Sequence, residues 1–344
     1  MPALNRILVI LPNWYGETLF ATPFLQALRR QRPTAAITAL GVPRCQEVLS
    51  GNPDVQEFIE LKEPRGLESL FGAGALLARL RTGGFDTAFL LRPSLSRALL
   101  LARARIPVRI GFAQAKSAWL LTHRAPPPPR RRHKALEYLP LLEAAGLRAE
   151  EGRCRYVVFD AERQAAQRLL GSLGMHGRRF IVLHPGANWP HKRWPEDRFA
   201  ALGDRFAAAG ADVLVTGGPQ DAALADAVAR GMRAGARRLP TSVSLRESAA
   251  CLEQASLIVT NDTGIAHIAA ALNRPLVALF GPTSPAYTGP LGDPARTRVL
   301  HHPECCPTIP CLNPDPPHPG MEAISVEEAY AAAQELLQPS AVHG

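Results

Sequence analysis

The chain has 344 residues, of which 47% are hydrophobic and 20% are charged, and its formal net charge is +9. This length is sufficient for two globular domains of ordinary size. No run of about 18 uncharged apolar residues occurs, which argues against a membrane-spanning helix. The first residues lack the layout of a secretory signal peptide, so we expect a cytoplasmic protein.

The positive charge favours an acidic partner, such as nucleic acid, anionic lipid or a phosphorylated substrate. A general preference for arginine over lysine is an alternative explanation, because lysine occurs at only four positions. No helix-turn-helix, zinc-finger or RNA-recognition motif is present, so we expect no nucleic-acid partner.

The first half of the chain alternates between short apolar runs and longer amphipathic segments. Repeated strand–helix units of this kind predict a mostly parallel sheet with helices on both faces, an α/β fold. The expected strands are 6–11, 36–40, 55–61, 87–91 and 108–111, and the expected helices are 19–30, 44–49, 66–81, 94–103 and 135–145.

The same alternation begins again after a passage at 148–179, which contains a predicted strand at 155–159 and a helix at 161–173. Parallel strands place the turns at their carboxyl ends along one edge of the sheet, where α/β proteins bind ligands. The expected strands of this half are 180–183, 211–216, 256–260 and 275–280, and the expected helices are 196–209, 222–232, 245–254, 265–272 and 326–337.

The most informative turn is Asn261-Asp262-Thr263-Gly264, which joins a buried strand to an alanine-rich helix. The amino end of a helix attracts phosphate through its N–H groups and its dipole. His267 lies three residues after Gly264, and this spacing points its side chain back toward the turn. The alternative is that Asp262 and Thr263 only cap the helix and that His267 is a core histidine.

Two further turns of the second half carry charged side chains. No P-loop motif is present, so another cation must neutralise a phosphate. Lys192 stands in the turn at 184–195, where no structural reason demands a cation, and an ammonium suits phosphate. Asp221 follows the next strand and could accept hydrogen bonds from a ribose diol, although capping of the following helix is the alternative.

In the first half, Pro12-Asn13-Trp14-Tyr15-Gly16-Glu17-Thr18 joins the first strand to the first helix. It has only one glycine, so it lacks the dinucleotide-binding fingerprint. Glu17 at the helix start could complement the helix dipole, or it could act as a general base. If the protein transfers a sugar from a nucleotide diphosphate, a single base such as Glu17 and a single displacement would invert the anomeric carbon.

The segment Pro126-Pro127-Pro128-Pro129-Arg130-Arg131-Arg132-His133-Lys134 combines four prolines with a basic run. The prolines predict a stiff stretch without regular secondary structure. The basic residues form either a solvated face or a loop that binds an acidic acceptor or a lipid surface.

Three of the six cysteines, Cys305, Cys306 and Cys311, lie in one proline-rich stretch after His301 and His302. The spacing contains no Cys-x-x-Cys pair and fits no common zinc template. We therefore expect free thiols in a reducing compartment, and no metal.

The turn with Glu17, the segment from Gly186 to Trp194, the Thr260–His267 stretch and the run 269–282 together resemble glycosyltransferase family 9, the ADP-heptose:lipopolysaccharide heptosyltransferases. The first turn and the Asn-Asp-Thr-Gly segment are most similar to those of heptosyltransferase II members. The resemblance covers nearly the whole chain and is strongest at 180–290.

The resemblance implies a GT-B fold, in which two Rossmann-like domains with parallel sheets face each other across a cleft. The acceptor domain would be 1–155 and the nucleotide-sugar domain 156–325, with a last helix at 326–344 that packs back on the first domain. It further implies no cofactor and no metal.

The resemblance implies specific roles for residues on the donor side. Lys192 would neutralise the diphosphate, and Asp221 would bind the ribose. The turn and helix start would hold the diphosphate and heptose, the loop after the first strand of this half would line the pocket, and a later loop would contact adenine. The turn and helix start contribute Asp262, Thr263, Gly264 and His267. The loop after the first strand of this half contributes Gly186 and Asn188, and the later loop contributes Val243.

On the acceptor side, the resemblance assigns the catalytic base to Glu17 and acceptor binding to Arg92, His133 and Lys134. The donor would be ADP-L-glycero-D-manno-heptose. The acceptor would be the lipopolysaccharide inner core, either Kdo2-lipid A or heptosyl-Kdo2-lipid A, reached by peripheral contact with the anionic inner face of the cytoplasmic membrane.

Family members usually carry aspartate where this chain has Glu17. The extra methylene moves the carboxylate by about 1 Å, and a displacement of that size can cost about 10²-fold in rate. Two alternatives therefore stand beside the heptosyltransferase: a family-9 transferase for another glycan or protein acceptor, and a weakly active protein that binds nucleotide sugars.

Overall fold

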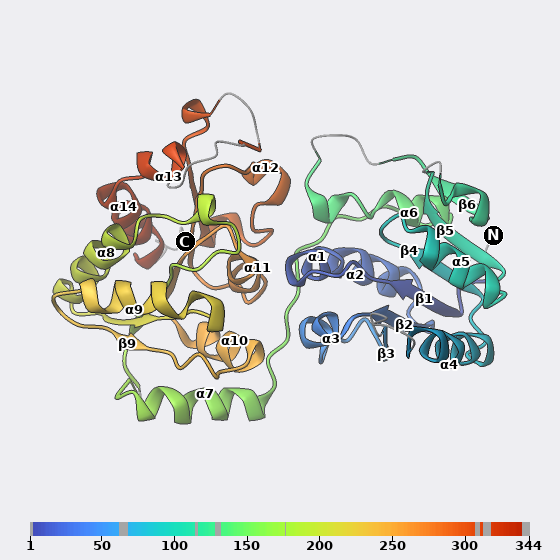
Figure 1. Cartoon of the computed structure of the whole chain (residues 1–344), viewed down its shortest axis with the longest axis horizontal. Helices are drawn as coiled ribbons and strands as arrows, with labels where there is room; N and C mark the ends of the chain where they lie inside the picture. Colours follow the sequence, from blue (N-terminus) through green and yellow to red (C-terminus); the bar gives the residue numbers. More distant parts are fainter. Residues whose placement is uncertain are drawn as a thin grey trace, which may run out of the picture. The chain divides into compact units, whose positions relative to one another are not determined.

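The computed structural model describes residues 3–61, 68–113, 116–127, 132–175, 177–306, 310–311 and 318–338. The chain divides into two compact units, Met1–Val157 (unit 1) and Val158–Gly344 (unit 2). Each unit is built on a six-stranded sheet with helices packed on it (Figure 1). None of the helices within these ranges is both long and apolar enough to cross a membrane.

The sheet of unit 1 has the order β3-β2-β1-β4-β5-β6, and its paired strands run parallel. This is the Rossmann order, in which the order of strand addition reverses between β1 and β4, the point at whose carboxyl ends α/β proteins bind ligands. The strands are β1 (Arg6–Ile10), β2 (Ala36–Gly41), β3 (Glu57–Glu60), β4 (Thr87–Leu90), β5 (Val108–Phe112) and β6 (His123–Ala125).

Helices cover both faces of this sheet because alternate residues of each strand point to opposite sides. Leu8 and Ile10 of β1 share one core with Leu80 and Leu101, which come from helices α4 and α5. On another strand, Phe89 packs edge-on against a phenylalanine of α2. The helices are α1 (Tyr15–Phe20), α2 (Thr22–Gln31), α3 (Pro43–Leu49), α4 (Glu68–Thr82), α5 (Leu95–Arg103) and α6 (Pro140–Ala144).

Unit 2 repeats the topology, since its sheet has the order β12-β11-β10-β7-β8-β9 and its paired strands are also parallel. The strands are β7 (Phe180–His184), β8 (Asp212–Val215), β9 (Arg237–Arg238), β10 (Leu257–Asn261), β11 (Leu276–Phe280) and β12 (Thr297–His301). The helices are α7 (Asp160–Ser172), α8 (Glu196–Ala208), α9 (Ala222–Gly231), α10 (Leu245–Gln254), α11 (Gly264–Ala271), α12 (Pro285–Thr288), α13 (Pro319–Ala323) and α14 (Val326–Leu337).

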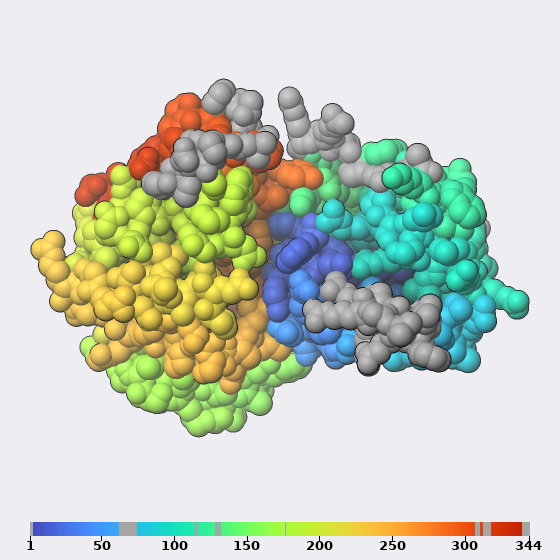
Figure 2. Space-filling model, in the orientation of Figure 1, coloured from blue at the N-terminus to red at the C-terminus, as the bar shows by residue number. Residues whose placement is uncertain are grey.

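One face of the unit 2 sheet is covered by α8, α9 and α14, whose buried residues share a core with alternate residues of the strands. The surfaces of α8 and α9 adjoin each other in the space-filling view (Figure 2). The sequence expectation placed the last helix on the first domain. Instead, Ala329, Ala332 and Ala333 of α14 belong to the core of unit 2, where small side chains allow the helix to approach α8 and the sheet closely.

Several boundaries differ from the expectations. The first helix begins at Tyr15 rather than 19, so Glu17 lies inside α1. The expected strand at 155–159 does not form, because this segment bonds to side chains of α2: the Arg155 amide donates to Thr22 Oγ1, and Gln26 Nε2 donates to the Arg153 carbonyl.

The expected helix at 135–145 is reduced to a 3-10 turn, η2 (Lys134–Leu136), and the short α6. The edge strands β6, β9 and β12 were not predicted. Each edge strand pairs on one side only, so its sequence shows little of the apolar pattern that marks a buried strand.

The expectation of free thiols in the cysteine-rich stretch is wrong for two of its three residues. Cys306 and Cys311 form a disulfide with Cα atoms 6.2 Å apart, whereas Cys305 is free. The residues at 307–309 and 312–317 of this stretch lie outside the described ranges, as do Pro128, Pro129, Arg130 and Arg131 of the proline-rich basic run.

Trp194 is the largest fully buried side chain of unit 2 and should contribute strongly to its stability. It is 1% exposed, packs edge-on against Phe199, and donates from Nε1 to the Ile324 carbonyl. We expect Trp194→Ala to lower the free energy of unfolding by about 3–5 kcal/mol, because it removes the packing and leaves a cavity. Urea unfolding followed by circular dichroism measures this loss.

The same substitution at Trp119, which is 69% exposed, serves as the control and should change stability by less than about 0.5 kcal/mol. Equal losses in the two variants would contradict the structural role assigned to Trp194.

Candidate active site

The centre of the site in unit 2 is the carboxylate of Asp262, which directly follows β10. Its side chain is 4% exposed, and its Oδ2 atom accepts hydrogen bonds from Lys192 Nζ at 2.5 Å and from Thr283 Oγ1 at 2.6 Å. Lys192 follows β7 and Thr283 follows β11, the two strands that flank β10. Three neighbouring strand ends therefore converge on one buried carboxylate.

Asn261, the last residue of β10, fixes the loop that carries Lys192. Its Nδ2 donates to the Pro185 carbonyl at 2.8 Å, and its Oδ1 accepts from the Trp194 amide at 3.1 Å. Both ends of the loop are thus attached to the same fully buried side chain. Asn261 belongs to the sequence motif, but the sequence did not reveal this bracing role.

The amino end of α11 lies beside this carboxylate. Thr263 is the N-cap, and its Oγ1 accepts from the Ile265 amide at 3.2 Å. The capping alternative is therefore correct for Thr263, whereas Asp262 bonds to Lys192 and Thr283 instead. His267 is buried in the first turn of α11. A helix start with this placement has the N–H groups and positive dipole end that bind anions.

Asp221 occupies the next strand end along the sheet, after β8. Its side chain makes no capping bond to α9, so the capping alternative fails. It pairs instead with Arg193 Nη2 at 3.2 Å, while Arg193 Nε donates to the Ala187 carbonyl at 3.0 Å. A Cβ atom at Gly186 would lie 2.4 Å from the Asp221 carboxylate, so a larger residue there would displace that side chain.

A buried histidine supports the edge between these two groups. His184 ends β7, and its Nδ1 lies 3.0 Å from Thr216 Oγ1. Burial lowers the pKa of His184 to about 4, against a smaller opposing effect of Asp221. The imidazole is therefore neutral at physiological pH and adds a hydrogen bond without adding charge.

The two remaining expected donor residues lie on loops at the same edge of the sheet. Asn188 is exposed on the loop after β7, and Val243 is half-buried on the loop between β9 and α10. The residues that the sequence analysis did not select are Arg193 and Thr283. Their position in the chain could have indicated them. Each lies after a strand, and the carboxylate that it binds lies after the neighbouring strand.

In unit 1, the sequence-selected residues Glu17, Arg92 and Lys134 come together. Glu17 Oε1 accepts from the Arg92 guanidinium and from Lys134 Nζ, the latter at 3.4 Å. Burial disfavours the charge of Arg92, but the carboxylate of Glu17 outweighs it and the pKa of Arg92 is raised. Glu17 Oε2 is buried and has no hydrogen-bond partner among the described residues.

The backbone of the Glu17 turn is held by Arg97 of α5. Its Nη1 donates to the Leu11 carbonyl at 2.8 Å, and its Nη2 donates to Asn13 Oδ1 at 2.5 Å. The turn is thereby fixed to α5, the helix that follows the neighbouring strand β4. The sequence analysis did not single out Arg97.

His133 lies next to Lys134 and caps η2, where its Nδ1 accepts from the Ala135 amide at 3.2 Å. Its ring packs edge-on against Phe20 of α1 with centroids 5.1 Å apart. His133 therefore connects the basic segment to the helix that carries Glu17.

Comparisons with known proteins agree with this architecture. The model of glycosyltransferase family 9 (heptosyltransferase) matches residues 73–314. Lipopolysaccharide heptosyltransferase 2 of Salmonella typhimurium and that of Escherichia coli K12 are each 30% identical over 314 residues, covering 85% of this chain and 87% of theirs.

Two solved structures share the fold over nearly the whole chain. The E. coli ADP-heptose lps heptosyltransferase II superposes with a TM-score of 0.81 at 26% identity, covering 96% of this chain and 98% of that one. A family 9 glycosyl transferase from Veillonella parvula DSM 2008 gives 0.86 at 26% identity, covering 97% and 98%. The chain therefore belongs to glycosyltransferase family 9 and has the GT-B architecture of two Rossmann-like units.

Proposed function

We propose that this protein transfers heptose, with inversion, from ADP-L-glycero-D-manno-heptose to the inner core of lipopolysaccharide. The observation that carries the proposal is the Lys192–Asp262–Thr283 set at the amino end of α11, in a chain of family 9. Relatives named lipopolysaccharide heptosyltransferase 2 support the choice of sugar and acceptor.

The donor chemistry follows from where negative charge develops. When the bond between the heptose and the diphosphate breaks, charge accumulates on the departing ADP, and a nearby cation and N–H groups stabilise it. Lys192 supplies the cation, and Asp262 orients its ammonium group. The start of α11 supplies the N–H groups, and Asp221 accepts hydrogen bonds from the ribose diol.

The acceptor chemistry requires a base, and Glu17 is our candidate. Its Oε1 is bound by two cations, so its Oε2 remains to take the proton of the attacking hydroxyl. Attack by that hydroxyl forms the new glycosidic bond as the bond to ADP breaks, which inverts the anomeric carbon. Arg92, Lys134 and His133 would contact the anionic core sugars.

Loss of the Lys192 cation should slow the chemical step. We expect Lys192→Ala to lower kcat by about 10²–10³-fold, by analogy with the removal of one oxyanion-stabilising donor. Turnover of ADP-heptose with a defined lipopolysaccharide core acceptor measures the effect. Arg233→Ala, which removes a cation of unit 2 whose side chain is 97% exposed, is the control and should leave kcat unchanged. Equal activity of the two variants would remove Lys192 from the mechanism.

Loss of the proposed base should separate chemistry from donor binding. We expect Glu17→Gln to lower kcat by about 10²–10⁴-fold, the usual contribution of a general base, while the affinity for ADP measured by calorimetry stays the same. Glu17→Asp keeps the carboxylate and should retain more activity than Glu17→Gln. Full activity of Glu17→Gln would show that another group is the base.

Binding and transfer assays of the unaltered protein distinguish the heptosyltransferase from the two alternative functions. Binding of ADP without any heptose transfer would favour a nucleotide-sugar-binding protein. Transfer only to a glycan or protein unrelated to lipopolysaccharide would favour a different family-9 transferase.

We further propose that unit 1 contacts the anionic inner face of the cytoplasmic membrane, where a lipid-anchored acceptor would be found. Leu95 and Leu99 of α5 and Trp119 of the adjoining 3-10 turn η1 (Ala118–Leu120) are exposed apolar side chains. The neighbouring sequence adds exposed cations at Arg103, Arg105, Lys116 and Arg124. Apolar and basic side chains together are typical of interfacial binding.

This proposal predicts binding to vesicles that contain phosphatidylglycerol, with weaker binding to pure phosphatidylcholine. The triple variant Leu95→Ser, Leu99→Ser, Trp119→Ser should bind at least about tenfold more weakly, because insertion of each apolar side chain contributes about 1.5–3 kcal/mol when complete. Val299→Ser, at an exposed apolar position of unit 2, is the control in co-sedimentation. Identical binding of the triple variant and the parent would exclude this surface.

A further inference from the structure

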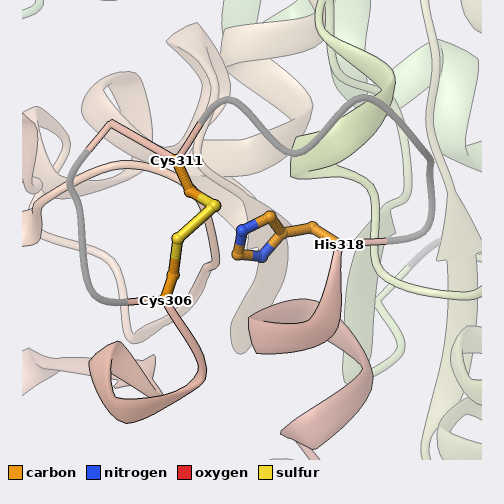
Figure 3. A group of neighbouring side chains, drawn as sticks. All are labelled: Cys306, Cys311 and His318. Carbon is orange, nitrogen blue, oxygen red and sulfur yellow. A yellow bond between two sulfur atoms is a disulfide. The ribbon is translucent and has the colours of Figure 1, made fainter.

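A second group of chemically reactive side chains lies in unit 2, outside the donor residues described above. Cys306, Cys311 and His318 each offer one ligand atom, and these atoms lie within 4.8 Å of one another. All three residues are buried, and His318 is completely so. Figure 3 shows the Nε2 edge of the His318 ring turned toward the two sulfur atoms.

The imidazole of His318 is half satisfied. Its Nδ1 accepts from the Gly320 amide at 3.0 Å, but its Nε2 is buried and has no hydrogen-bond partner among the described residues. Burial lowers the pKa of His318. A buried polar atom without a partner is costly, and its presence points to a ligand that satisfies it.

Two other histidines near His318 also have buried ring nitrogens without partners among the described residues. The ring of His301 bonds to the backbone of Gly281, while its Nε2 is buried without a partner in the described part of the chain. A bond from one ring nitrogen to a backbone carbonyl, with the other nitrogen left open, is how proteins orient metal-binding histidines. Both ring nitrogens of His191 are likewise buried and unbonded within the described residues.

We propose that Cys306, Cys311 and His318 bind one thiophilic divalent cation of the Zn²⁺ class when the two cysteines are reduced. Two thiolates and an imidazole are the donors that Zn²⁺ prefers, and they leave the fourth position of a tetrahedron open. Zn–S bonds of about 2.3 Å place two sulfurs roughly 3.8 Å apart in a tetrahedral site. With Cα atoms 6.2 Å apart, rotation of the cysteine side chains achieves this separation.

The metal and the disulfide are alternative states of the same sulfur atoms. To bind the cation, each thiol loses a proton and forms one metal–sulfur bond, with no change in oxidation state. To form the disulfide, the two thiols lose two protons and two electrons to an oxidant such as a low-molecular-weight disulfide, which is reduced to two thiols. The cation therefore protects the pair from oxidation, and the disulfide prevents binding of the cation.

Binding at Nε2 also has a consequence for His318. The neutral ring must then carry its proton on Nδ1, so the Gly320 amide loses its acceptor. The metal–nitrogen bond offsets this loss. The change of tautomer gives a signature in the ¹⁵N resonances of His318 that a purely structural histidine would not show.

The position of the cluster explains what the cross-link would stabilise. The Cys311 amide donates to the Pro282 carbonyl at 3.0 Å, and a Cβ at Gly281 would lie 3.2 Å from His318 Nδ1. Thr283, the residue after Pro282, binds the Asp262 carboxylate. The cluster thus braces the turn that presents Thr283, and the metal would have a structural role that does not depend on the proposed transfer reaction.

The test uses the full chain, reduced with a phosphine and freed of metal, and titrated with Co²⁺ as a spectroscopic substitute for Zn²⁺. We expect one equivalent of Co²⁺ to give the visible bands of a tetrahedral ion and a thiolate charge-transfer band, both abolished by Zn²⁺. The disulfide form should give neither. His318→Gln should weaken Co²⁺ binding by at least about tenfold.

Two cysteine variants complete the test. Cys306→Ser with Cys311→Ser should remove the charge-transfer band, whereas Cys251→Ser, a buried free cysteine in α10, should leave the spectrum unchanged. Circular dichroism confirms that each variant is folded. Absence of the bands in the reduced parent protein, or equal spectra in the double variant and the parent, would overturn the proposal.

Discussion

The second unit depends on one buried carboxylate more than on any other polar group. Asp262 is almost inaccessible to water, yet it accepts hydrogen bonds from an ammonium and a hydroxyl on the two adjacent strand ends. A buried charge is tolerated only when it is paired and hydrogen-bonded, so loss of Lys192 would leave the carboxylate without a counter-charge, and loss of Thr283 would remove one of its hydrogen bonds. The positions of Lys192 and Thr283 are therefore coupled, and the loop that brings the cation cannot move without a cost at the carboxylate.

Both units use the same strand order, but their charged side chains are arranged differently. In unit 2, the carboxylates of Asp262 and Asp221 orient cations, and the helix start adds positive potential. In unit 1, two cations surround the carboxylate of Glu17 and leave one of its oxygens without a partner. One arrangement suits an anion that departs, and the other suits a proton that must be accepted, as the proposed transfer requires.

The sequence predicted the parallel α/β architecture and the strand-end turns well, because buried strands and their turns have strong local signatures. It failed for the edge strands β6, β9 and β12, and for 155–159, where the backbone bonds to side chains of α2 that are distant in sequence. The Asp262 carboxylate was located from its turn, but its partner Thr283 was not, since a bond across strands leaves no local pattern. The placement of α14 in the core of unit 2 was missed for the same reason, because packing between elements distant in sequence leaves no local pattern.

The cysteine-rich stretch shows most clearly why spacing alone is insufficient. Cys311 and His318 are brought together because the Cys311 amide bonds to the turn after β11, and Gly281 of that turn lies against His318 at the start of α13. The sequence draws attention to His301 and His302 before the cysteines, whereas the third proposed ligand, His318, follows them at the start of α13. Cys311 bonds to Pro282, and the next residue, Thr283, bonds to the Asp262 carboxylate, so two adjacent residues connect the sulfurs to that carboxylate. That turn therefore offers a route by which a change at the sulfurs reaches the Thr283–Asp262 bond.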